Sequence, residues 1–409
     1  MKRNIVVGLD LGTTKIAVAV GEVNPDGAIS VLGLSKVDSA GLKKGSIVDI
    51  ESAVRAIDEA MEEVERISGI HITSSRTGFG GISVGTVNNR ATIAVGHPGH
   101  EITSEDVGRV IQAARLVTVP PDRSVIHIIP RQYTVDGYEG IIDPVGMVGT
   151  RLEVEVVIVT AATAALQNIV KTITKANTRV KEIALSSILA AESVLQPAEK
   201  EMGVALIDIG GGTCDIAVFE QGSLVFASVL PIGGDYITRD LAVGLRTTVE
   251  EARKLKEKVG FAVMAGVPDD RMVEVPSIYG KDSRQVSEKV ISSIIQPRVE
   301  EILELIDLEL RRTGFRGGLP GGAVFTGGTA LLKGIIQAGE EYLNMPVRLG
   351  YPENLGLVPN ESYTPENAAV LGNLVYGAKN LYDAGGMDQD LGINAMFSRV
   401  VQWFKDLFS

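Results

Sequence analysis

Two glycine-rich turns of one design lie far apart in the sequence. The first, residues 10–15, reads Asp-Leu-Gly-Thr-Thr-Lys, and the second, residues 208–215, reads Asp-Ile-Gly-Gly-Gly-Thr-Cys-Asp. Each turn follows one apolar, β-branched run and leads into another, so each is predicted to be the tip of a β-hairpin. Glycine lets a backbone approach a ligand closely, and successive N–H groups there form a concave anion site. One such turn would be ordinary turn chemistry, but two that both open with Asp predict a shared polyphosphate site.

A polyphosphate held between two lobes needs donors from both sides and a cation to offset its charge. Mg²⁺ keeps most of its waters and is usually held through one or two carboxylates together with the phosphates. Asp10 and Asp208 are the expected carboxylates, one on each hairpin, acting on the metal through water. The alternative is that both aspartates only cap turns. The expected phosphate contacts are Gly12, Thr13, Thr14 and Lys15 from the first hairpin, and Gly210, Gly211, Gly212 and Thr213 from the second.

Two more glycine pairs extend this pattern. Gly327-Gly328-Thr329 follows a short strand at 323–326, and Gly233-Gly234 opens a predicted helix. A strand, a Gly–Gly turn and a helix N-terminus together make a seat for an anion or a nucleotide face. The sequence contains no GxxxxGK[ST] segment, which excludes a P-loop, and its glycine loops lack the GxGxxG spacing of dinucleotide sites.

Length and composition limit the classes of protein. A chain of 409 residues is expected to form at least two lobes. Its formal net charge of −12 argues against a general nucleic-acid binder, because attraction to phosphate needs a basic surface. The single cysteine, Cys214, excludes an intramolecular disulfide and suits a reducing cytosol. No apolar run approaches the roughly 18 residues of a membrane span.

Hydrophobic periodicity predicts an α/β chain with an inserted module. Residues 86–95, 124–135 and 153–160 have strand character around one short helix, 105–116, and are expected to form a compact α+β unit. The longest predicted helix, 287–312, contains Pro297, which is expected to kink or divide it. The other predicted helices are 50–67, 164–175, 187–195, 236–245 and 249–259.

Residues 394–409 are predicted to form an amphipathic helix after a flexible linker at 383–393. The only Trp of the chain lies there, and Trp with Phe on one face is typical of helices that lie in a membrane interface. The segment carries two basic residues and one acidic residue, so apolar burial is expected to dominate its binding. Docking on the core of the protein, or on a partner, is the alternative. The expected membrane-facing residues are Met396, Phe397, Val400, Val401, Trp403, Phe404, Leu407 and Phe408.

The three glycine loops, in this order, resemble those of the actin, Hsp70 and sugar-kinase ATPase superfamily, and within it the bacterial FtsA family. The resemblance implies an actin-like two-lobed ATPase fold, with duplicated ribonuclease-H-like domains, an inserted subdomain and a C-terminal amphipathic helix. It implies ATP and Mg²⁺ as ligands, with Arg253 and Lys256 near the nucleoside. The boundaries expected are 1–84, 163–199 and 364–382 for lobe 1; 200–230, 231–309 and 310–363 for lobe 2; and 85–162 for the inserted subdomain.

The resemblance also implies a role in cell division. It implies a protein that polymerises on the cytoplasmic membrane face at the septum, anchors the FtsZ ring there and recruits later division proteins. The FtsZ C-terminal peptide is expected on residues 231–309, with Arg298 as the contact residue. Ser187 occupies the place where related ATPases have a catalytic Glu, and Glu192 is the only catalytic candidate nearby. A serine does not accept a proton as a carboxylate does, so ATP binding with slow or no hydrolysis is expected.

Three other functions share parts of this pattern. A pilus-assembly actin homologue shares the core and the inserted module, but the aromatic segment at 394–409 separates the two. A small-molecule kinase would need no such segment and would turn over ATP rapidly with its substrate. A chaperone ATPase is disfavoured because nothing after the nucleotide lobes is long enough for a peptide-binding domain.

Overall fold

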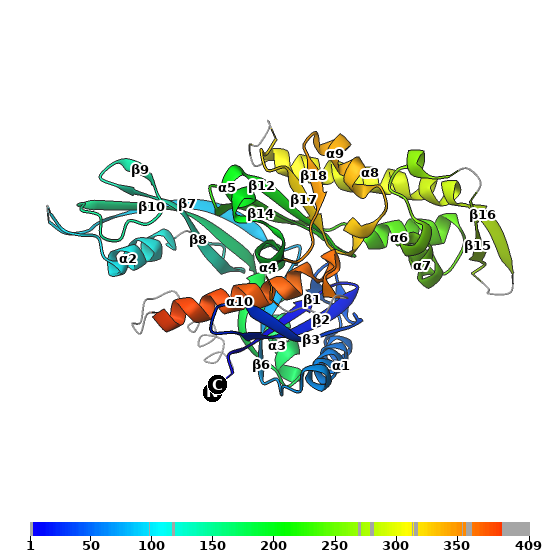
Figure 1. Ribbon diagram of the computed structural model, residues 1–409, viewed down its shortest axis with the longest axis horizontal. Helices are drawn as coiled ribbons and strands as arrows, with labels where there is room; N and C mark the ends of the chain where they lie inside the picture. The colour runs from blue at the N-terminus through cyan, green and yellow to red at the C-terminus, as the bar shows by residue number, and fades with distance from the viewer. Residues whose placement is uncertain are drawn as a thin grey trace.

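The computed structural model describes residues 3–97, 99–116, 119–268, 271–278, 282–312, 314, 318–353, 355–356 and 362–386. These residues form an elongated molecule with two lobes and a module that extends from them (Figure 1). The module lies at one end, and the hairpin of β15 (Met272–Pro276) and β16 (Ser283–Ser287) lies at the other.

Lobe 1 is built on a five-stranded sheet in the order β11-β6-β1-β2-β3. Its first three strands in sequence pair antiparallel, whereas β6 lies parallel to β1 and β11 lies parallel to β6. Alternate residues of β1 and β2 face opposite sides of the sheet, as the pleat requires. The bounds are β1 Ile5–Leu11, β2 Lys15–Val23, β3 Ile29–Asp38, β6 Ser74–Phe79 and β11 Arg179–Leu185.

Helices cover both faces of this sheet. On one face, α1 (Ile50–Ser68) and α3 (Thr163–Lys175) pack against Leu9, Ile16 and Val18. On the other face, α10 (Ala368–Gly386) packs against smaller side chains of β1 and β2. Both α1 and α3 were predicted from their apolar periodicity, and the structure confirms them.

Lobe 2 repeats the arrangement of lobe 1. Its sheet has the order β14-β13-β12-β17-β18, with three antiparallel strands followed by two parallel ones. The repeat confirms the predicted duplication, in which each glycine turn joins the first two strands of a lobe. The bounds are β12 Val204–Ile209, β13 Cys214–Glu220, β14 Ser223–Leu230, β17 Ala323–Thr326 and β18 Val347–Leu349.

The helices of lobe 2 also lie on two faces. The short helix α4 (Ser186–Val194) packs with the start of α10 between the two sheets, and α5 (Pro197–Met202) follows it. The opposite face of the sheet is covered by the larger apolar cluster of the lobe. That cluster includes residues of α6 Gly234–Gly244, α7 Val249–Val259, α8 Glu288–Arg312 and α9 Ile335–Leu343.

Of the two effects expected of Pro297, a kink or a division, the division does not occur, because α8 is one continuous helix. A proline inside a helix leaves the carbonyl four residues earlier without its donor. That carbonyl belongs to Ser293, and both Ser293 and Pro297 lie on the exposed side of α8. Water can replace the lost bond there, whereas the buried face of the helix keeps its packing.

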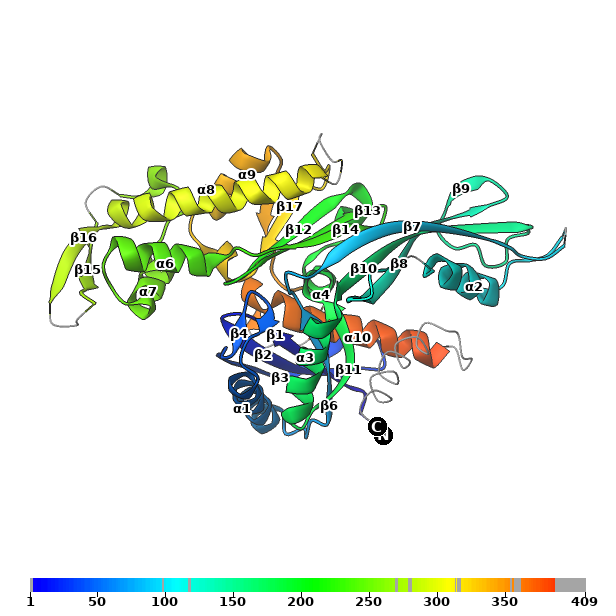
Figure 2. The ribbon, with the colours of Figure 1, turned by 180° about the vertical axis from the view of Figure 1, so that it is seen from behind.

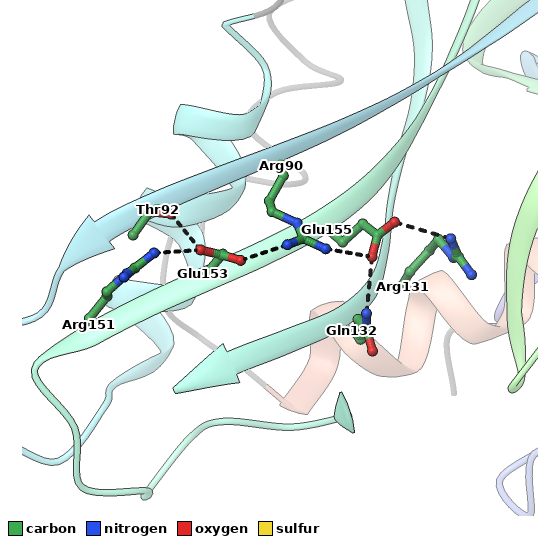
Figure 3. Close-up of polar contacts among 7 residues, drawn as sticks. All are labelled: Arg90, Thr92, Arg131, Gln132, Arg151, Glu153 and Glu155. Carbon is green, nitrogen blue, oxygen red and sulfur yellow. Dashed lines mark hydrogen bonds and ion pairs between the residues drawn. The ribbon is translucent and has the colours of Figure 1, made fainter. Parts of the chain in front are cut away.

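The inserted module is an antiparallel sheet with one helix; it contains the three predicted strands and a fourth, β9, that was not predicted. The sheet has the order β7-β10-β8-β9, and α2 (Ser104–Ala114) packs against its apolar face. On the other face, Glu153 and Glu155 form a network of ion pairs with three arginines, shown in Figure 3. The strand bounds are β7 Gly85–Ala94, β8 Arg123–Val135, β9 Tyr138–Ile141 and β10 Arg151–Ala162.

Residues 383–386 of the predicted linker are helical, because α10 continues to Gly386. A helix that is already nucleated by packed residues extends at little further cost, even through glycine and polar residues. The predicted amphipathic helix at 394–409 lies outside the described residues. Among the helices that are described, none is long and apolar enough to cross a membrane.

Candidate functional site

The two glycine hairpins face each other across a cleft of about 620 Å³ between the lobes. Almost all residues predicted to contact a ligand line this cleft. They are Asp10, Gly12, Thr13, Thr14 and Lys15 from lobe 1, and Asp208, Gly210, Gly211, Gly212, Thr213, Arg253, Lys256, Gly327, Gly328 and Thr329 from lobe 2.

The tips of the hairpins are in direct contact. A Cβ atom at Gly212 would lie 2.5 Å from Oγ1 of Thr13, and one at Gly211 would overlap the side chain of Thr14. Real Cβ atoms do not come so close to other atoms, so only glycine permits this approach of the two turns. The backbone N–H groups of both turns therefore border the same space.

Gly233 and Gly234 do not line the cleft but hold the second hairpin in place. The N–H of Gly234 donates to the carbonyl of Gly210 at 2.9 Å, and that of Asp235 donates to Gly211 at 2.8 Å. A Cβ at Gly233 would lie 2.6 Å from the same carbonyl of Gly210. Thr329 Oγ1 donates to that carbonyl too, at 3.0 Å. The first turn of α6 and the third glycine loop thus fix the shape of the second hairpin.

Three carboxyl groups gather at the base of the cleft. Burial raises the pKa of Asp208 to about 7, the charge of Asp10 adds to this rise, and Lys15 opposes it. Burial also raises the pKa of Asp10, and burial together with Asp208 raises that of Asp215 well above its usual range. Within the described residues, Oδ1 of Asp215 has no hydrogen-bond partner. Such a group of acids favours a bound cation, which would stabilise the ionised carboxylates.

Lys15 is held near these carboxyl groups by two residues that come late in the sequence. Its Nζ donates to the carbonyl of Glu366 and, at 3.2 Å, to Oδ1 of Asn367. Burial lowers the pKa of Lys15, while the charges of Glu366, Asp10 and Asp208 raise it. Glu366 and Asn367 belong to the short 3-10 helix Pro365–Asn367, which leads into α10.

The outer part of the cleft is lined by one helix and one loop of lobe 2. Arg253, Lys256 and Glu257 come from α7, and Leu332 and Lys333 follow the third glycine loop. Lys256 Nζ donates to the carbonyl of Gly234 at 3.3 Å, and burial lowers its pKa. This mix of apolar and cationic groups, next to the anion-binding turns, suits the sugar and base of a nucleotide.

Neither residue considered for catalysis lies where it was expected. Glu192 lines a second cavity, and its carboxylate pairs with Lys200 at 2.8 Å and with Lys379. Ser187 is fully buried, and it is Ser186, one residue earlier, that lines the cleft. Residues of a helix that follow one another point in different directions, so a shift of one position turns the side chain away from the cleft.

The predicted partner contact, Arg298, lies on α8 with its side chain 24% exposed. Its Nε donates to Asp240 at 2.6 Å, and its guanidinium also pairs with Glu301. The residue is held in an ion-pair network rather than extended into solvent.

Several residues of the cleft were missed, among them Asp215, Gly45, Gly80 and Asp235. Asp215 had a signal in the sequence, because it closes the same turn that Asp208 opens and pairs with it across the hairpin. Gly45 and Gly80 had none, since they reach the cleft only through the packing of lobe 1. Among the described residues there is no group of three or more His, Cys, Asp or Glu that could hold a metal ion by themselves.

Family models match two parts of the chain. The model described as cell division protein FtsA matches residues 205–372, and the model of the SHS2 domain inserted in FTSA matches residues 81–160. The second match agrees with the bounds of the inserted module.

Curated FtsA proteins resemble nearly the whole chain. The protein of Pseudomonas aeruginosa is 37% identical over 383 residues, which cover 94% of this chain and 91% of that protein. That of Bacillus subtilis is 38% identical, covering 86% and 80%. That of Escherichia coli K12 is 33% identical, covering 92% and 91%.

Solved structures share the fold at low identity. A PilM–PilN type IV pilus biogenesis complex has a TM-score of 0.65 at 14% identity, covering 91% of this chain and 98% of that chain. MreB 5 of Spiroplasma citri bound to AMPPNP has a TM-score of 0.56 at 14% identity, covering 94% and 99%. The pilus likeness therefore concerns the fold alone, whereas the likeness to FtsA extends to the sequence. The fold is actin-like with an SHS2 insertion, and the chain belongs to the FtsA family of cell-division proteins.

Proposed function

We propose that the cleft binds ATP together with Mg²⁺. The observation that carries this proposal is the contact of two Asp-led hairpins, one from each lobe, around one shared cavity. Their N–H groups, with Thr13, Thr14, Lys15 and Thr213, would hold the phosphates from both sides. The outer part of the cleft, with Arg253 and Lys256, would take the nucleoside.

Asp10 and Asp208 would hold the metal through water. Burial raises the pKa of both carboxyl groups, and the charge of Asp10 adds to the rise at Asp208; a divalent cation would stabilise their ionised forms, which supports this assignment. When bound, Mg²⁺ supplies charge neutralisation for the phosphates. The protein supplies the two opposed walls that fix the phosphates between the lobes.

We expect slow ATP hydrolysis or none. Ser186, the residue of α4 that lines the cleft, has a hydroxyl that does not take a proton from water as a carboxylate does. Burial and the charge of Asp208 raise the pKa of the Asp215 carboxyl well above its usual range, which makes this carboxyl a weaker acceptor of protons in the empty cleft. The nucleotide would then act as a ligand that favours the closed lobes, and closed lobes favour polymerisation.

We further propose that the protein polymerises on the cytoplasmic membrane face at the septum, where it anchors the FtsZ ring and recruits later division proteins. Membership of the FtsA family supports the division role. The anchor would be the amphipathic segment 394–409, whose apolar face includes Trp403. The FtsZ C-terminal peptide would dock on residues 231–309 near Arg298, whose guanidinium is fixed by Asp240.

Calorimetry of the full chain with ATP and Mg²⁺ tests the nucleotide site. We expect Asp208→Ala to weaken ATP binding by about tenfold or more, because it removes one ionised partner of the metal and phosphate group. Asp122→Ala, which removes an exposed carboxylate of the inserted module, is the matched control and keeps the affinity of the unmodified protein. No heat of ATP uptake, or equal affinity in the two variants, would contradict the proposal.

A further inference from the structure

A two-residue turn of lobe 1 reaches the mouth of the cleft. Strands β4 (Leu42–Lys43) and β5 (Ser46–Ile47) pair as a small hairpin, with Leu42 opposite Ile47. Both of these side chains pack on the core of lobe 1. Figure 2 shows β4 on the side of lobe 1 that faces lobe 2. The hairpin is therefore fixed at its base and presents its tip, Lys44-Gly45, to the other lobe.

The tip contacts the first glycine turn of the cleft. Gly45 lines the cleft, and its N–H donates to Oγ1 of Thr13 at 3.3 Å. Lys44 and Gly45 have φ values of 50° and 67°, the pair of positive φ angles that a type I′ turn needs. A Cβ at Gly45 would overlap the carbonyl of Gly80, so the tip also packs closely against lobe 1.

Lys44 extends from this tip to an aromatic ring of lobe 2. Its Nζ lies 5.3 Å from the centroid of the Tyr236 ring, within the range of a cation–π contact. Tyr236 belongs to the first turn of α6, next to Asp235, whose N–H holds the second glycine hairpin. The contact therefore links the two glycine turns indirectly. Lys44 is next to Gly45, which bonds the first turn, and Tyr236 is next to Asp235, which bonds the second.

The ring of Tyr236 also carries two cations of its own lobe. The guanidinium of Arg298 lies 5.6 Å from the ring centroid, and that of Arg239 lies 5.8 Å away. Of the cations that the described residues place over this ring, only Lys44 comes from lobe 1. The ring is thus held in place from within lobe 2, and Lys44 is the cation that lobe 1 contributes to it among the described residues.

Lys44 also occupies a backbone position that suits it poorly. Residues with side chains rarely have positive φ, and Asn tolerates it better than Lys. Asn at position 44 should therefore keep the turn while removing the cation. This makes Lys44→Asn a variant that separates the side-chain contact from the fold of the hairpin.

We propose that Lys44 is a positioning residue that latches the two lobes over the cleft through the ring of Tyr236, and so slows the release of bound nucleotide. The proposal rests on the proposed function, because it assumes that the cleft holds a nucleotide. With the latch closed, the N–H of Gly45 stays on Thr13, and the first phosphate turn stays opposite the second. Without it, the lobes separate more easily, although every group that would touch the nucleotide is unchanged.

Stopped-flow release of a fluorescent ATP analogue from the full chain, with Mg²⁺, tests the latch. We expect Lys44→Asn to raise the dissociation rate by about threefold to tenfold, the range of one cation–π contact, and to leave the association rate nearly unchanged. Tyr236→Leu should have a similar effect, and the double variant should add nothing to either single one. Lys43→Asn and Arg239→Ala are the controls: the first changes the neighbouring lysine, and the second removes a cation that does not cross between lobes.

The outcomes separate the latch from the nucleotide site. If the unmodified protein binds the analogue but Lys44→Asn releases it no faster than Lys43→Asn does, the latch is wrong and the nucleotide site stands. If the unmodified protein binds no analogue, the proposed function fails. The proposed contact between Lys44 and Tyr236 is then tested by hydrogen–deuterium exchange of residues 42–47 without nucleotide. Faster exchange in Tyr236→Leu than in Arg239→Ala supports the latch, and equal exchange overturns it.

Discussion

At the scale of single residues, the buried carboxyl of Asp208, which we propose to hold Mg²⁺ through water, also affects the stability of the fold. Its pKa of about 7 lies above the usual value of 3.8, so the folded protein keeps a proton that the unfolded chain releases between about pH 4 and pH 7. A raised pKa of this kind stabilises the fold at low pH, and that stabilisation is lost as the pH rises through 7. The protein with an empty cleft should therefore become less stable as the pH rises from about 4 to about 7.

We expect Asp208→Asn to remove this pH dependence. Asn has nearly the same shape but does not ionise, so at pH 8 the variant should be more stable than the unmodified protein by about 1–4 kcal/mol. The difference should shrink toward pH 5. Urea denaturation without nucleotide at both pH values measures it, with Asp122→Asn as the control for an exposed carboxylate. A difference that does not depend on pH would show that ionisation of Asp208 is not its cause.

The residues of the cleft that lie in glycine turns could be predicted from the sequence, because such turns are recognisable by their composition. Asp10, Asp208 and Lys15 line the cleft because they belong to the two glycine hairpins that form its walls. Ser187 was misplaced because helical register was inferred from a resemblance, and an error of one residue rotates a side chain by about 100°. The contact of Lys44 with Tyr236 was not predicted, because contact between lobes depends on tertiary packing that no local pattern records.

At the scale of elements, the crossing of α4 and α10 determines how the lobes meet. Gly372 lies where the helices approach most closely, and a Cβ there would overlap the carbonyl of Leu189. Ser193 Oγ adds a hydrogen bond to the carbonyl of Ala368 at 2.8 Å. The absence of a side chain at position 372 therefore allows backbone contact between the two helices that connect the lobes.

We expect Gly372→Ala to destabilise the protein. Helix propensity alone would favour Ala by about 1 kcal/mol. Overpacking against a backbone atom costs about 1–3 kcal/mol, and this cost is larger than the gain where the helices do not separate. Thermal unfolding should show a lower midpoint. Gly266→Ala is the control, because a Cβ there would meet only Phe261, at an ordinary 3.6 Å. A higher midpoint for Gly372→Ala would mean that α4 and α10 move apart at little cost, so that helix propensity determines the change in stability.

Long amphipathic elements were predicted well, and short ones were not. The helices α1, α7 and α8 were identified from many periodic residues each. The hairpin of β4 and β5 has two residues in each strand and gives no periodic signal. Helix α8 also continues through Pro297, because this residue lies on an exposed face that tolerates the missing hydrogen bond.

At the scale of the whole molecule, the duplication could be predicted, but the arrangement of its parts could not. Two hairpins of one design imply two similar sheets, and the strand orders confirm this. The module also contacts lobe 2, where Thr86 of β7 accepts from the N–H of Ala227 at 3.1 Å and Arg131 of β8 pairs with Glu220 at 3.4 Å. Figure 2 shows β7 and β8 running toward the sheet of lobe 2. Such contacts join segments about 90 to 140 residues apart, and composition alone does not encode them.

The charge of the whole molecule leads to a prediction about membrane binding. A net charge of −12 opposes approach to anionic lipid, and residues 394–409 carry only Arg399 and Lys405 against Asp406. Binding of the full chain to anionic vesicles should therefore depend on apolar burial, at about 1.5–3 kcal/mol for each large side chain. Raising the salt from about 0.1 M to about 1 M shortens the Debye length from about 10 Å to about 3 Å, so it should screen repulsion and leave binding undiminished.

Co-sedimentation with vesicles checks this prediction. We expect deletion of residues 393–409 to abolish binding, and Trp403→Glu to weaken it strongly, because a charge then enters the apolar face. Arg399→Gln is the matched control on the polar face and should bind nearly as well as the unmodified chain. If salt releases the protein, or if Arg399→Gln binds as poorly as Trp403→Glu, attraction between charges holds the chain at the membrane. If the deleted protein still sediments, the anchor lies elsewhere in the molecule.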